Sequence, residues 1–242
     1  MNLYEKQINK ELERWYADIV KSASLLERAS KGIQTRTQKL MPQKVQSTIT
    51  AAVERMVEAV LFGSDLLSGI GDTANLSLAE RDYLAQHLFQ SYMKTAVAEG
   101  AAFGAGGVLL GLADLPALMS IKLKFLFDCA KLYGYDTRDQ NERVYLLYIF
   151  QLAFSSRAHR LQVFHTLHGW ENAPHPLVDW ERFQIEYRDY LDIAKLLQLM
   201  PVIGSVAGAT ANYSLMNRLR LNAMNSYRMR ILGKRWNGMI SG

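Results

Sequence analysis

The sequence predicts an all-α protein, and three observations lead to this prediction. Apolar residues recur at helical spacing in several long stretches, no stretch alternates convincingly with a period of two, and capping residues or prolines stand where helices would begin. The 242 residues are 49% hydrophobic and 21% charged, which is typical of a folded globular protein. We therefore expect a single multi-helix bundle in which two glycine-rich apolar helical segments pack together.

Residues 1–75 are expected to form amphipathic helices. In residues 3–24 the apolar positions recur at helical spacing between charged ones, and they are Ile8, Leu12, Trp15, Ile19 and Val20. A weaker basic helix is expected over residues 25–40, and Pro42 marks the first turn of the next helix. The expected buried stripe of that helix is Val53, Met56, Val57, Val60 and Leu61. The N-terminus has no apolar core of a signal peptide or anchor, so we expect a cytoplasmic protein.

A glycine-rich core segment is expected over residues 96–134. Ser77 and Glu80 have the spacing of a capping box, which predicts that the preceding helix starts at Leu78 and runs into this segment. Four of its glycines fall into two pairs four residues apart, and such spacing lets another backbone approach closely. They are Gly100, Gly104, Gly107 and Gly111. Residues 100–113 hold 14 uncharged positions, short of the about 20 that span a bilayer. A buried hairpin or a shallow membrane insertion fits this length.

The later part of the chain is expected to contain further helices and one linker. After Gly134, capping residues at 136–139 begin a helix with the apolar body ERVYLLYIFQLAF, and the stretch ENAPHP marks the linker. From Leu196 to Asn217 there are 22 uncharged residues, but Pro201 and several polar side chains make this a poor lipid-facing helix. Gly204 and Gly208 are again four apart. We expect the C-terminal segment, residues 196–236, to pack its small face against Gly100–Gly111.

The net charge of +5 is unevenly distributed. Between Lys21 and Lys44 there are six basic residues and one acid, and after Asp192 there are seven basic residues and no acid. Such runs are solvated helix faces or bind an anionic partner. The candidates for binding a membrane surface are Arg218, Arg220, Arg228, Arg230, Lys234 and Arg235. We expect no nucleic acid, because the runs carry few aromatic residues for stacking and no helix-turn-helix is evident.

Two stretches resemble the EcsC family. One is EGAAFGAGGVLLGLADLPALMSIKLKFLFDCAKLYGYDTRDQNERVYLL, and the other comprises MPVIGSVAGATANYSLM and AMNSYRMRIL. The family takes its name from the third protein encoded with the Ecs ABC transporter, which is tied in Gram-positive bacteria to protein secretion and processing. The resemblance implies one EcsC-like helical domain over residues 1–242. It also implies a non-enzymatic accessory protein, peripheral to the inner face of the cell membrane, whose partners are ABC transporter subunits. Anionic lipid is the further partner that the two basic runs favour.

The family has no established catalytic residues that could be carried over to this chain. The alternative function, which depends on candidate residues in the sequence, is a hydrolase-type enzyme. Glu99 and Asp114 bracket the apolar turns and can be imagined as an acid and base pair, although Asp114 is also placed to cap the helix entered at Pro116.

A histidine cluster is the other candidate for chemistry. His165 and His168 are three residues apart on one expected helix, near His159, His175 and Glu171. We expect ordinary surface or cap histidines, no metal and no cofactor. Cys129 lies in an apolar run with no activating group nearby.

Both glycine-rich segments can also bury each other across a homodimer, which remains a further expectation.

Overall fold

The computed structural model describes residues 2–29, 51, 54–55, 57–63, 69–104, 115–154, 157–172 and 204–233. Within these, it places the side chains of all but 22–29, 96–104, 115–119, 157–158 and 204–212. The labelled helices are α1 (Leu3–Ala29), α4 (Leu78–Gly104), α6 (Leu115–Leu132), α7 (Gln140–Phe154), α8 (Arg157–His168) and α11 (Gly204–Leu232). These residue ranges contain no strand, which confirms the predicted all-α class.

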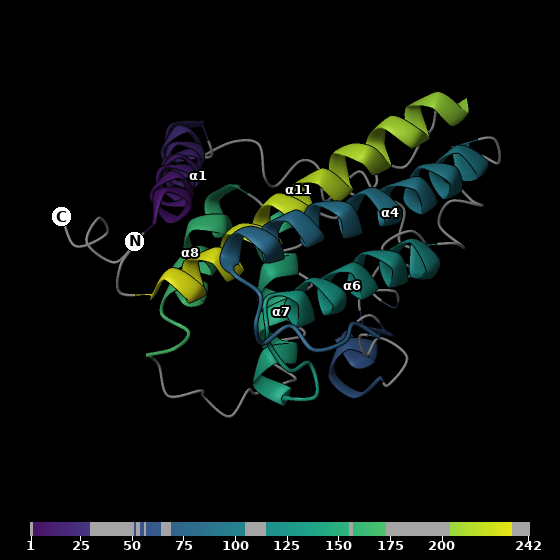
Figure 1. Cartoon of the computed structure of the whole chain (residues 1–242). Coiled ribbons are helices and arrows are strands. Elements are labelled where there is room, and N and C mark those ends of the chain that lie inside the picture. The colour runs from purple at the N-terminus through teal and green to yellow at the C-terminus, as the bar shows by residue number, and fades with distance from the viewer. Residues whose placement is uncertain are drawn as a thin grey trace.

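Helix α11 is the centre of the arrangement, because it touches each of the other five labelled helices. Its longest contact is with α4, and the two helices lie side by side along most of their length (Figure 1). Helix α6 packs on α4, α7 packs on α11, and α1 packs mainly on α8. The run 222–227 of α11 is buried throughout, as expected for a helix surrounded by others.

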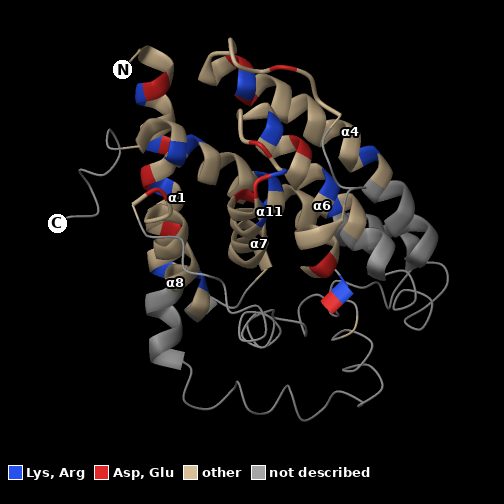
Figure 2. Cartoon of the chain, turned by 90° about the horizontal axis from the view of Figure 1, so that it is seen from below, with Lys and Arg blue, Asp and Glu red and all other residues tan. Residues whose placement is uncertain are grey.

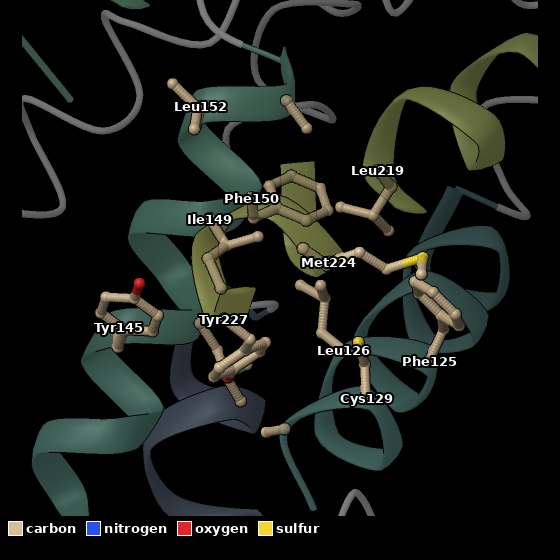
Figure 3. Packing of buried hydrophobic residues seen from close by; sticks show 14 of the residues in the cluster. Phe125, Leu126, Cys129, Tyr145, Ile149, Phe150, Leu152, Leu219, Met224 and Tyr227 are labelled. Carbon is tan, nitrogen blue, oxygen red and sulfur yellow. The ribbon is translucent and has the colours of Figure 1, made fainter. Parts of the chain in front are cut away.

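The hydrophobic core lies where α6, α7 and α11 meet (Figure 3). Phe125 and Leu126 from α6, Ile149 and Phe150 from α7, and Leu219 from α11 are at most 2% exposed. Burial of a large apolar side chain contributes about 1.5–3 kcal/mol to folding, so this contact is a main source of stability. The predicted N-terminal stripe also enters the core, where Ile8, Leu12 and Ile19 are at most 1% exposed.

The start of α4 confirms the predicted capping box. The Ser77 amide donates to Glu80 Oε2 at 2.8 Å, and the Glu80 amide donates back to Ser77 Oγ at 3.3 Å. These bonds satisfy two amides that a helix start leaves without a partner. The pKa of Glu80 is lowered by the same hydrogen bonds, because they favour the ionised carboxylate.

The end of α6 is set by Gly134, which has a φ of +92°. The Tyr135 amide donates to the Ala130 carbonyl and the Gly134 amide to the Lys131 carbonyl, both at 3.0 Å. This is the Schellman arrangement, which closes a helix with a left-handed residue. The Arg81 guanidinium donates to the neighbouring Tyr133 carbonyl, so α4 is tied to this turn.

Gly134→Ala is expected to lower the free energy of unfolding by about 1–2 kcal/mol. The left-handed backbone disfavours a Cβ, and one built at this position lies 2.5 Å from Arg81 Nη1. Denaturant titration of the full chain measures the change. Gly69→Ala is the matched control, since nothing lies within 4 Å of a Cβ there and its φ is not in the left-handed region. Equal losses in the two variants would contradict the explanation.

Candidate functional site

The most extensive polar cluster in the described part of the chain lies along the last turns of α11. We call it the arginine network. It is built on two buried ion pairs, Arg228 with Asp82 and Arg230 with Glu142. Arg228 and Arg230 are two residues apart, so they leave the helix in different directions and reach different neighbours. The network therefore joins several helices at once.

The first half of the network centres on Asp82 of α4, which is 4% exposed. Its Oδ1 accepts from Arg228 Nε at 3.0 Å and from the Tyr133 hydroxyl, and its Oδ2 accepts from the Tyr4 hydroxyl at 2.6 Å. Arg228 Nη1 also lies 3.2 Å from a Glu11 carboxylate oxygen. One carboxylate thus connects α1, α4, α11 and the end of α6.

The second half centres on Glu142 of α7. Its Oε2 accepts from Arg230 Nη1 and its Oε1 from the Tyr227 hydroxyl, each at 2.7 Å. Arg230 Nη2 lies 2.6 Å from Glu171, whose side chain is largely exposed. The Arg230 guanidinium carbon lies 3.8 Å from the centroid of the Tyr135 ring, which is a close cation–π contact. This half connects α7, α11 and the turn after α8.

Burial and neighbouring charges together shift the pKa values of the side chains in the arginine network. Burial raises the pKa of Glu142, while Arg230 and the Tyr227 hydroxyl act in the opposite direction. Burial lowers the pKa of Arg228, but the Asp82 carboxylate outweighs it and the net shift is upward. Burial also raises the pKa of Tyr227 well above its ordinary value, so this hydroxyl stays protonated and donates.

This arrangement holds helices together. Both oxygens of Asp82 and of Glu142 already accept hydrogen bonds from buried or partly buried groups within the protein. A general acid or base must instead reach a proton on the substrate. The geometry assigns these two carboxylates to the fold.

Three of the arginines predicted to bind a membrane surface have roles inside the protein. Arg228 and Arg230 form the network, and Arg220 donates to Gln86 Oε1 at 2.9 Å and covers the Phe89 ring at 5.0 Å. Arg218 is partly buried, and Lys234 and Arg235 lie outside the described residues. Membrane binding by this set stays a prediction, and Figure 2 shows both signs of charge interspersed over the described helices.

The predicted carboxylate pair falls outside what the structure describes, so it stays a prediction. Glu99 lies in α4 with its side chain outside the described set, and Asp114 lies outside the described residues altogether. The carboxylates at the centre of the arginine network are Asp82 and Glu142, which sequence reasoning missed. The available signal was indirect, because the acid-free basic run is consistent with an anionic partner inside the chain as well as outside it.

The histidines of α8 lie beside an aromatic cluster. The His165 and His168 rings are 5.8 Å and 6.1 Å from the Phe164 ring centroid, and His165 is exposed. Glu171 is held by Arg230, His159 is partly exposed, and His175 lies outside the described residues. Among the residues that the structure describes, no group of three or more histidines, cysteines or acids is placed to hold a metal ion.

The glycine pairs are placed only in part. Gly100 and Gly104 lie in the last turns of α4, and Gly204 and Gly208 in the first turns of α11, while Gly107 and Gly111 lie outside the described residues. Whether these glycines pack on each other stays a prediction. None of the described helices has a stretch apolar and long enough to cross a membrane.

Comparison with known proteins decides the family. The model of the EcsC protein family matches residues 6–232 of the chain. This chain belongs to the EcsC family. It is 42% identical to "Protein EcsC" of Bacillus subtilis (strain 168) over 223 residues, which cover 92% of this chain and 94% of that protein.

A second relative from the same organism is more distant. It is "Uncharacterized protein YdbA" of Bacillus subtilis, 27% identical over 246 residues that cover 91% of this chain and 90% of that protein. No solved structure gives a significant match. The EcsC family match covers both ion pairs of the arginine network, while Tyr4 lies just before the matched residues.

Proposed function

We propose that this protein is a non-enzymatic accessory protein at the inner surface of the cell membrane, where it works with an Ecs-type ABC transporter in protein secretion and processing. The observation that carries the proposal is the EcsC family match over residues 6–232, because the family is named for the protein encoded with that transporter. The arginine network supports the non-enzymatic part of the proposal, since its buried carboxylates accept hydrogen bonds within the fold. Anionic lipid is the proposed surface partner.

Two measurements on the full chain test the proposal. Tagged protein is expected to recover the transporter subunits from crosslinked membranes of the same cells. It is also expected to float with vesicles that contain phosphatidylglycerol at low salt, and to come off as the salt concentration rises. Failure in both measurements would overturn the proposal.

The choice of charge variants follows from the structure. Neutralising Arg228 or Arg230 removes a buried ion pair, so any loss of binding would be confounded by loss of the fold. Lys234 and Arg235, two predicted membrane-binding residues outside the network, are the better test. Lys234→Gln with Arg235→Gln tests this part of the basic run: weaker vesicle binding at an unchanged unfolding midpoint would place the lipid contact there, and unchanged binding would place it elsewhere on the protein.

A further inference from the structure

Three helix ends meet at one end of the bundle. Along α4, Asp82 pairs with Arg228 and Phe89 with Arg220, so α11 runs antiparallel to α4. Helix α6 is also antiparallel to α4, since the Tyr133 hydroxyl beyond its end bonds to Asp82 and its Phe125 contacts Tyr92. The last turns of α4 and the first turns of α6 and α11 therefore share one end, at the upper right of Figure 1.

The described helix residues at this end of the bundle are almost without charge. We call it the uncharged end and define it as residues 96–104 of α4, 115–121 of α6 and 204–217 of α11. Glu99 is the one ionisable acid or base among Asp, Glu, Lys, Arg and His in these ranges. Tyr213 lies within it and is 53% exposed. Amphipathic aromatic residues of this kind are enriched at the level of lipid headgroups.

The first charges behind the uncharged end are basic on all three helices. We call Lys94 of α4, Lys124 of α6 and Arg218 of α11 the basic collar. Lys94 is exposed, and the Lys124 side chain is 30% exposed, with its Nζ 3.3 Å from Asp128. Lys122 is left out because it is only 5% exposed.

The basic collar favours an anionic membrane as the partner of this surface. Long basic side chains can lay their carbon stems along apolar surface while their heads reach anionic phosphates. From Lys94 to the end of α4 is ten residues, or about 15 Å of helix, roughly half of the bilayer's hydrocarbon core. This length suits one leaflet.

We propose that the uncharged end enters one leaflet of an anionic membrane, with the basic collar at the level of the phosphates. The inference rests on the proposed function and names the surface that meets the lipid. It keeps Arg218 of the predicted membrane-binding set and moves the contact away from Arg220, Arg228 and Arg230, which serve the fold. Glu99 opposes entry while it is ionised, because a charge is costly in hydrocarbon.

Binding to phosphatidylglycerol vesicles tests the collar in the full chain. Lys94→Gln is expected to weaken binding about fivefold, with a similar further loss for Lys124→Gln, while Glu99→Gln strengthens it. Lys6→Gln with Lys10→Gln is the matched control, since both lysines are exposed on α1, away from the uncharged end (Figure 1). The control pair is expected to change vesicle binding by less than about twofold, a smaller change than the loss of one lysine that contacts a lipid headgroup.

An environment-sensitive fluorophore tests insertion directly. It is attached to Ala101→Cys or Phe103→Cys, positions about 200° apart around α4, so that the two probes sample two sides of the helix. Native Cys129 is 0% exposed and does not compete for the label. A blue shift on anionic vesicles at one of these positions, and none at a Gln7→Cys control, is expected.

The outcomes separate the inference from the proposed function. Vesicle binding with no shift at positions 101 and 103, or with equal losses in the collar and control variants, would overturn the inference and leave the proposed function standing. A fluorescence blue shift that grows with protein concentration in the absence of vesicles would mean that a second copy covers the uncharged end. That result would also overturn the inference. No binding to any vesicle would overturn both the inference and the membrane part of the proposed function.

Discussion

Replacing Arg230 with alanine is expected to lower the free energy of unfolding by about 3–5 kcal/mol, the cost of breaking a buried ion pair from one side. Arg230 is 8% exposed and its partner Glu142 is 5% exposed, so the carboxylate left behind is poorly hydrated. The contact with Glu171 adds little, because that side chain is 57% exposed and its charge is screened by solvent. Chemical denaturation followed by circular dichroism measures the change.

The pH dependence of this variant gives a second, independent readout. Burial raises the pKa of Glu142, and Arg230 lowers it, so the variant raises it further. An acid whose pKa is higher in the folded state than in the unfolded state stabilises the fold when protonated, and this contribution is lost as pH rises through the folded pKa. The deficit of Arg230→Ala should therefore shrink as the pH falls toward the ordinary glutamate pKa of about 4.3.

Two controls distinguish a lost ion pair from a lost side chain. Arg14→Ala removes an exposed arginine of α1 and is expected to change stability by at most about 0.5 kcal/mol. Removing both charges, with Arg230→Leu and Glu142→Leu, is expected to recover much of the loss, because no buried charge is then unpaired. If the double variant were no more stable than Arg230→Ala, the ion-pair explanation would be wrong.

Replacing Asp82 with alanine is expected to cost about 3 kcal/mol, the lower end of the range for a broken buried pair. The lower end applies because Arg228 keeps its contact with Glu11. The change also leaves the hydroxyls of Tyr4 and Tyr133 without their acceptor. Since Tyr4 belongs to α1, we also expect faster hydrogen exchange in the amides of α1, measured by mass spectrometry.

Tyr4→Phe is the matched control for Asp82. It removes one hydrogen bond and keeps the ion pair, so it should cost about 1 kcal/mol. Asp82→Asn keeps an acceptor without the charge and is expected to fall between the two. Equal losses for Asp82→Ala and Tyr4→Phe would mean that the ion pair with Arg228 contributes nothing measurable.

The arginine network changes how the charge of the C-terminal helix is understood. After Asp192 the chain carries basic residues and no acid, which from sequence alone favours an external anionic partner. In the structure, Arg228 and Arg230 find their anions 146 and 88 residues earlier in the chain. A basic run therefore has two physical explanations, and only the fold separates them.

The sequence by itself determined the helices, several of their ends and the family. Apolar spacing, the Ser77 and Glu80 capping box and the turn after α6 depend on interactions within a few residues, which a local pattern records. Only the tertiary structure decided that Asp82 meets Arg228 and that Glu142 meets Arg230. Those pairs depend on which helix faces come together when the whole core packs, and no spacing within a single helix contains that information.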